Sequence, residues 1–128
     1  MVSSMTICNG LLYSGGFDGS VCITSTADTP KRVNSVSLQM PISVLKYFKK
    51  SDFIIVGFTD GTIQLYKSDG FTLHTYFKVH NNVIVSVLCF EDLGLFMVLD
   101  FSGVVSCWQV LDSEAIKKKM AGPEMSMQ

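Results

Sequence analysis

A repeat with a period of 42 residues is the feature of this sequence that most restricts its fold. Three segments align with one another without a gap: residues 11–23, 53–65 and 95–107. Their turn glycines, Gly19, Gly61 and Gly103, are evenly spaced by that period. A fixed period of tens of residues indicates that each copy is one supersecondary unit, which buries its apolar surface against its neighbours.

Each copy is predicted to be a β-hairpin. An apolar run is followed by a tight turn, and then by a run in which large apolar residues alternate with small or polar ones. Asp18-Gly19 and Asp60-Gly61 occupy the turns, and glycine adopts the positive φ that such turns need without steric cost. We therefore expect Asp18 and Asp60 to form turns rather than to serve as catalytic groups or metal ligands.

Further strands are predicted on both sides of these hairpins. Ile42–Phe48 and Ile84–Phe90 precede the second and third copies, and residues 32–38 and 71–77 follow the first and second. Short strands at this spacing, with no helix between them, predict an all-β fold of antiparallel sheets.

The hairpin sequences resemble the WD-repeat family. Residues 57–66 read Gly-Phe-Thr-Asp-Gly-Thr-Ile-Gln-Leu-Tyr, with Tyr66 where the family usually has tryptophan. The third copy carries the tryptophan itself, Trp108, and His80 lies ahead of its first strand. The resemblance covers residues 1–110 and implies a β-propeller of four-stranded blades, with blades at about 1–39, 40–78 and 79–111.

The resemblance also implies a buried polar set in each blade, made by His, Ser or Thr, the turn Asp and Trp. No copy shows all four at the usual places, because Thr24, Val56, Val98 and Ser102 replace members of the set. An incomplete buried network is better replaced by apolar packing than left half satisfied. We therefore expect apolar burial to supply most of the stability, with Tyr66 and Trp108 in the core and His80 either hydrogen-bonded near Trp108 or exposed.

Three blades are too few to close a ring, since propellers usually have four to eight. We expect the chain to be the C-terminal part of a larger propeller, or a subunit whose ring a partner or a second copy completes. The third blade is expected to lack its outer strand. Residues 112–128 are expected to be a polar tail with a short helix that begins at Asp112 or Ser113.

The composition argues against several classes of partner and indicates a cellular location. The ten basic and eleven acidic residues nearly cancel, so no net charge favours nucleic acid or an anionic membrane. No apolar run reaches the roughly 20 residues of a membrane-spanning helix, and the N-terminus does not resemble a secretory signal. Four scattered cysteines suit a reducing compartment, so we expect a cytoplasmic or nuclear location.

The residues also argue against catalysis. The chain has two histidines, no nucleophile motif, no phosphate-binding glycine loop and no metal-ligand spacing, so we predict no enzyme activity, no cofactor and no metal. The Phe-Arg-Arg-Gly motif of phosphoinositide-binding relatives is absent, which weakens the alternative of a membrane-associated propeller. A truncated, non-functional fragment is a further alternative.

We predict a scaffold that binds other proteins through one rim of the ring. The family places the turns between second and third strands on that rim, together with the connections into each first strand. The predicted rim residues are Phe17, Phe58, Thr59, His80, Asn81, Asn82 and Phe101. Exposed aromatic side chains at loop tips are favoured as anchors at interfaces, and the alternative is that one or more of them folds back onto its blade.

Overall fold

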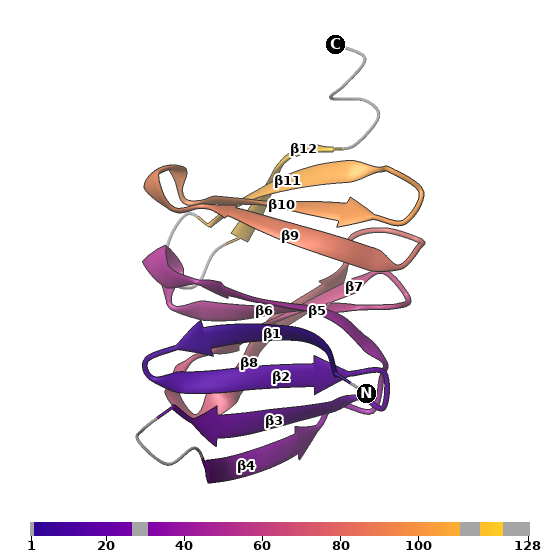
Figure 1. Ribbon diagram of the computed structural model, residues 1–128. Helices are drawn as coiled ribbons and strands as arrows, with labels where there is room; N and C mark the ends of the chain where they lie inside the picture. Colours follow the sequence, from indigo (N-terminus) through magenta and orange to yellow (C-terminus); the bar gives the residue numbers. More distant parts are fainter. Residues whose placement is uncertain (1, 27–30, 111–115, 122–128) are drawn as a thin grey trace.

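The computed structural model describes residues 2–26, 31–110 and 116–121, and these form three four-stranded antiparallel sheets stacked one on the next (Figure 1). In each sheet the strands follow one another in chain order. The first sheet contains β1 (Val2–Cys8), β2 (Leu11–Gly16), β3 (Ser20–Ser25) and β4 (Lys31–Ser37). The second contains β5 (Ile42–Phe48), β6 (Phe53–Phe58), β7 (Thr62–Lys67) and β8 (Thr72–Lys78). The third contains β9 (Ile84–Phe90), β10 (Leu95–Asp100), β11 (Val105–Val110) and β12 (Ile116–Ala121).

Each sheet is one blade and one copy of the repeat, so the predicted all-β architecture is confirmed. Short 3-10 helices lie in three of the connections: η1 (Lys49–Ser51), η2 (Asp69–Phe71) and η3 (Glu91–Leu93).

The third blade has an outer strand, which corrects two expectations. Residues Ile116–Ala121 form β12, which pairs antiparallel with β11, instead of the helix expected in the tail. The prediction of a helix used only neighbouring residues in the sequence. In the folded chain, the free backbone N–H and C=O groups along the edge of β11 favour pairing with another strand. Lysine is common on edge strands, and β12 contains Lys117, Lys118 and Lys119. The expected helix start, at Asp112 or Ser113, lies outside the described residues.

The hydrophobic core lies between the blades rather than inside a single sheet. One cluster joins the first and second blades and includes Tyr13, Val21, Leu45, Ile54 and Tyr66. A second cluster joins the second and third blades and includes Phe48, Ile55, Leu65, Val87 and Phe96. A sheet covered on both faces carries apolar residues on both, which explains why every residue of β6 is buried.

The innermost strands β1, β5 and β9 carry the contact from blade to blade (Figure 1). Between the first two blades, Ser4 Oγ accepts a hydrogen bond from Leu45 N–H at 2.9 Å, and Thr6 Oγ1 accepts one from Tyr47 N–H at 3.0 Å. These side chains satisfy backbone groups on the facing strand. The first two blades are therefore held in register by polar as well as apolar contacts.

Candidate functional site

The hairpin turns between the second and third strands of the blades form the candidate site. Gly19, Gly61 and Gly103 have φ of 83°, 92° and 92°. In the first two turns the aspartate side chain holds the backbone, since Asp18 Oδ1 accepts from Ser20 N–H at 3.0 Å and Asp60 Oδ1 accepts from Thr62 N–H at 2.9 Å.

The third turn is held by Asp100, which lies at the end of β10 and two residues before the position of Asp18 and Asp60. Its Oδ1 accepts hydrogen bonds from Ser102 N–H at 2.8 Å, from Ser102 Oγ at 2.7 Å and from Val104 N–H at 3.1 Å. One carboxylate oxygen thus organises the whole turn and leaves Oδ2 for another partner.

That partner is His80, and the result is a continuous chain of four hydrogen-bonded side chains. His80 Nδ1 lies 2.9 Å from Asp100 Oδ2, and His80 Nε2 lies 2.8 Å from Ser106 Oγ. Trp108 Nε1 donates to the same Ser106 oxygen at 2.9 Å. The third blade therefore contains a complete polar set, which corrects the expectation that none exists. Asp100 and Ser106 supply the acid and the hydroxyl that the resemblance placed at the positions of Ser102 and Val98.

Two donors of this set follow from their partners. Indole N–H donates to Ser106 Oγ, and His80 Nδ1–H donates to the Asp100 carboxylate, which as an ionised group can only accept. Burial raises the pKa of Asp100, but hydrogen bonds from Ser102, Val104 and His80 outweigh this effect and hold the pKa below its usual value. Asp100 is therefore the anionic end of the chain.

The Asp100–His80–Ser106 order is also the order of a catalytic triad, but the serine is enclosed. Ser106 is 2% exposed, and its oxygen already serves both the imidazole and the indole. A nucleophile must reach a substrate carbonyl, and a serine so enclosed does not.

The second blade fills the corresponding positions differently. Phe58 lies where the third blade has Asp100, and Gln64 and Tyr66 lie where it has Ser106 and Trp108. Tyr66 Oη donates to Gln64 Oε1 at 2.6 Å, while Phe58 is fully buried. Asp100 and Ser106 stand at strand positions where the other copies have apolar or larger residues. This difference between the copies is the signal in the sequence that indicates the polar set.

The predicted rim residues separate into exposed and buried groups. Phe101 is 76% exposed and Phe17 is 50% exposed, and both occupy the same place in their turns. Thr59 holds that place in the second turn and is half-buried. Phe58 and His80 are buried, so the expectation that they present side chains on the rim is wrong. A shift of one residue along a strand moves a side chain to the other face, which separates Phe58 from Thr59.

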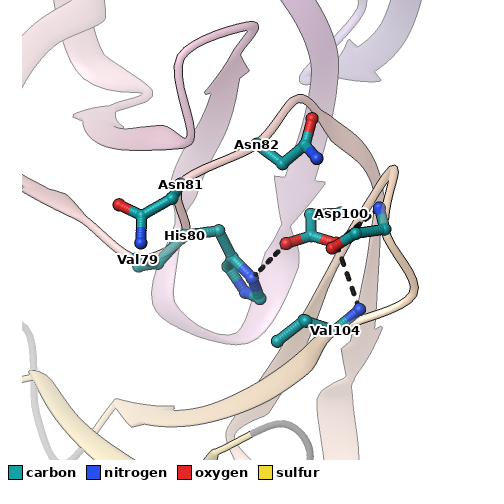
Figure 2. Close-up of a pocket in the computed structure, with 7 residues that line it drawn as sticks. Val79, His80, Asn81, Asn82, Asp100 and Val104 are labelled. Carbon is teal, nitrogen blue, oxygen red and sulfur yellow. Dashed lines mark hydrogen bonds and ion pairs between the residues drawn. The ribbon is translucent and has the colours of Figure 1, made fainter.

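A concavity of about 330 Å³ lies beside the polar set. Its lining includes His80, Asn81, Asn82, Asp100 and Ser102 (Figure 2). Figure 2 shows the imidazole of His80 pointing toward Asp100, with Asn81 and Asn82 on the same loop. Asn81 is exposed, and Asn82 Oδ1 accepts from Val83 N–H at 2.8 Å. The rim thus combines a polar hollow with the exposed ring of Phe101.

The residues that the structure describes contain no group of three or more His, Cys, Asp or Glu side chains placed to hold a metal ion. None of their helices has the length and apolar character needed to cross a membrane. The four cysteines are thiols.

Comparison with known proteins identifies the fold. No family model and no curated protein matches the sequence. Among solved structures, Sqt1 of Saccharomyces cerevisiae, a WD40 protein, superposes with a TM-score of 0.80 at 15% identity and covers 94% of this chain. Two designed propeller proteins also superpose: Ika4 (TM-score 0.78, 13% identity) and Ika8 (TM-score 0.73, 13% identity). The chain has the fold of a β-propeller segment.

The chain is shorter than each of these structures. It covers 35% of Sqt1, 72% of Ika4 and 38% of Ika8, while 96% of this chain matches Ika4 and 94% matches Ika8. The likeness to them is therefore one of blade architecture.

Proposed function

We propose that this chain is a scaffold that binds other proteins through the rim formed by its hairpin turns. The observation that carries the proposal is the exposure of Phe17 and Phe101 at the same position of the first and third turns. Large aromatic side chains are costly to leave in water and dominate the energy of many interfaces. The similarity to WD40 and other propeller proteins supports the same reading.

The rim offers a partner both apolar and polar contacts. Phe101 lies in the turn whose backbone Asp100 fixes, so the ring is presented on an ordered base. Asn81 and Ser102 are exposed beside it and provide hydrogen-bonding groups. Binding loops on a rigid sheet framework are a common arrangement for recognition. A protein surface with an apolar pocket and a polar border would complement this rim.

A binding role accounts for the polar set better than catalysis does. Trp108, Ser106, His80 and Asp100 fix the third turn relative to the sheet, and Ser106 is enclosed. The balanced charge favours a protein partner over nucleic acid or an anionic membrane. Four thiols suit a cytoplasmic or nuclear location, which we include in the proposal.

Affinity capture from a lysate with three purified proteins tests the rim. The first is the wild type, the second is Phe17→Ala/Phe101→Ala, and the third is the control Tyr76→Ala. Tyr76 is 66% exposed on β8, an outer strand, and truncation there removes similar aromatic area away from the turns. We expect the rim variant to lose proteins that the wild type and the control both retain, with unchanged thermal unfolding. Retention of the same proteins by all three would overturn the proposal.

A further inference from the structure

The rim is one continuous band of backbone rather than a set of separate loops. It consists of the turns at residues 16–20, 58–62 and 100–104 and of the connections at 37–41 and 78–83, all at the same end of the strands (Figure 1). Each segment is joined to the next by a backbone hydrogen bond: Leu38 N–H to Gly19 O at 2.7 Å, Thr59 N–H to Pro41 O at 3.2 Å, Val79 N–H to Gly61 O at 3.1 Å and Phe101 N–H to Val83 O at 2.8 Å. The side chains on this band are therefore held in fixed positions relative to one another.

The charge on the rim is negative, although the charge of the whole chain is balanced. Within the rim segments the acidic residues are Asp18, Asp60 and Asp100, and Lys78 is the one lysine or arginine. The connections at the opposite end of the strands carry both signs, with the basic residues Lys49, Lys50 and Lys67 and the acidic residues Asp52, Asp69, Glu91 and Asp92. A surface of one sign attracts a partner of the opposite sign and repels a partner of its own.

Asp18 and Asp60 each have a carboxylate oxygen free for a partner. Both side chains are exposed, and each uses Oδ1 to accept a hydrogen bond from the backbone N–H two residues later in its turn. Among the residues that the structure describes, neither aspartate makes an ion pair. An ionised carboxylate accepts about four hydrogen bonds. Both groups can therefore bind a cationic side chain without any change in the turns.

An exposed aromatic ring lies next to one of these carboxylates. Phe17 directly precedes Asp18 in the first turn and is half exposed. A guanidinium group suits this pair, because its N–H groups bond to a carboxylate while its planar face stacks on an aromatic ring. An ammonium group is more strongly hydrated and has no planar face. The pair therefore favours arginine over lysine.

The third turn adds a polar hollow to the rim. Asp100, Asn81 and Ser102 line this hollow of about 330 Å³, and its described lining contains no lysine or arginine. Hydrogen bonds hold the pKa of Asp100 below its usual value, so the hollow lies beside a negative charge. The exposed ring of Phe101 lies in the same turn. The first and third turns thus both combine an exposed ring with an aspartate.

We infer that the segment of the partner protein that docks on the rim is cationic and carries arginine beside apolar residues. The inference rests on the proposed binding function and names the chemistry of the partner. Apolar side chains of the segment contact the rings of Phe17 and Phe101, and its guanidinium groups bond to Asp18 and Asp60. The apolar contacts supply most of the affinity, and the charges select which protein binds.

Fluorescence anisotropy with two labelled peptides tests the inference on the 128-residue chain. The first peptide alternates arginine and leucine, and the second has citrulline, the neutral analogue of arginine, in place of every arginine. We expect the arginine peptide to bind the wild type at least about 10-fold more tightly at low salt. This difference should shrink in about 0.5 M sodium chloride, because salt screens exposed charges over a Debye length that falls from about 10 Å at 0.1 M to about 3 Å at 1 M.

Two matched variants locate the charges that matter. Asp18→Asn/Asp60→Asn removes two charges from the rim and keeps the Oδ1 acceptors that hold both turns. Its dissociation constant for the arginine peptide should rise by about 4- to 25-fold, since one exposed ion pair contributes a factor of about 2 to 5. The control Asp69→Asn/Asp92→Asn makes the same change in net charge with two exposed aspartates at the opposite end of the strands. It should change the dissociation constant by less than about 2-fold.

Equal binding of the two peptides, no binding of the arginine peptide, or equal losses in the two aspartate variants would overturn the inference. Affinity capture from a lysate separates this failure from a failure of the proposed function. If Phe17→Ala/Phe101→Ala loses proteins that Asp18→Asn/Asp60→Asn retains, the scaffold function stands and the cationic partner is wrong. If both rim variants retain every protein that the control Tyr76→Ala retains, both proposals are wrong.

Discussion

The backbone of Gly61 lies directly against the backbone of His80. Gly61 carbonyl accepts hydrogen bonds from Val79 N–H at 3.1 Å and from His80 N–H at 3.2 Å, and a β-carbon on Gly61 would overlap the His80 carbonyl. This contact joins the turn of the second blade to the loop that leads into the third blade and its polar set. The glycine is required here for space as well as for its positive φ.

Gly61→Ala and Gly103→Ala should therefore differ, although both glycines have φ of 92°. A β-carbon on Gly103 meets nothing within 4 Å, so that variant should lose only about 1–2 kcal/mol from backbone strain. Gly61→Ala must also displace the His80 carbonyl, and we expect a loss of about 3–5 kcal/mol. Urea unfolding of the two variants measures the difference, and equal losses would contradict the contact.

Ser106 should contribute more to the stability of the chain than an exposed serine does, because it belongs to the buried polar set. Ser106→Ala removes the hydroxyl that His80 Nε2 and Trp108 Nε1 share, and leaving buried polar groups unsatisfied costs about 1–3 kcal/mol. Ser35→Ala, on the exposed part of β4, is the control and should change stability by less than about 0.5 kcal/mol. Urea midpoints at pH 7 report both values. Equal stability of the two variants would show that the set contributes nothing.

Asp100 should make the free energy of unfolding decrease as the pH falls into the acid range. Its pKa is lowered in the folded state, because the hydrogen bonds to the carboxylate outweigh the effect of burial. Stability from such a group is fully present above the unfolded-state pKa of about 3.9 and is lost as the pH falls through the folded-state value. We expect the stability advantage of wild type over Asp100→Asn to shrink between pH 5 and pH 2. A constant advantage in urea titrations across that range would argue that Asp100 is not the ionised partner of His80.

The glycine and isoleucine contacts between blades should show strong coupling. Gly57→Ala places a β-carbon 2.8 Å from Ile84 Cγ2 and should lose about 1–3 kcal/mol through overpacking. Ile84→Ala alone should lose about 2–5 kcal/mol through the cavity it leaves. Because the smaller residue at 84 makes room for the new methyl group, the double variant should lose less than the sum. A double-mutant cycle measures this coupling, and losses that add within about 0.5 kcal/mol would contradict the close contact.

Local chemistry made much of the fold predictable. The residues around Gly19, Gly61 and Gly103 specify turns by themselves, since positive φ and the Asx bond at Asp18 and Asp60 are properties of short segments. The alternating runs on either side then specify strands, and the bounds of Ile42–Phe48 and Ile84–Phe90 are confirmed.

Residues that are distant in the sequence and meet only in the folded blade are harder to predict. The repeat does not single out Asp100 and Ser106, because it aligns them with Phe58 and Gln64, where no polar set of this kind exists. Only the approach of the His80 loop to the end of β10 gives the two polar residues a common partner.

The hairpins and the antiparallel class of the sheets could be predicted from the sequence, because each depends on residues within a few positions of one another. The tertiary structure decided which face each side chain occupies, so that Phe58 is buried while Phe101 is exposed. It also turned Ile116–Ala121 into β12, since the edge of β11 offers backbone partners that no local helix signal can reveal. The physical reason is the same in both cases: burial and strand pairing are decided by neighbours in space, and those neighbours come from other blades and other strands.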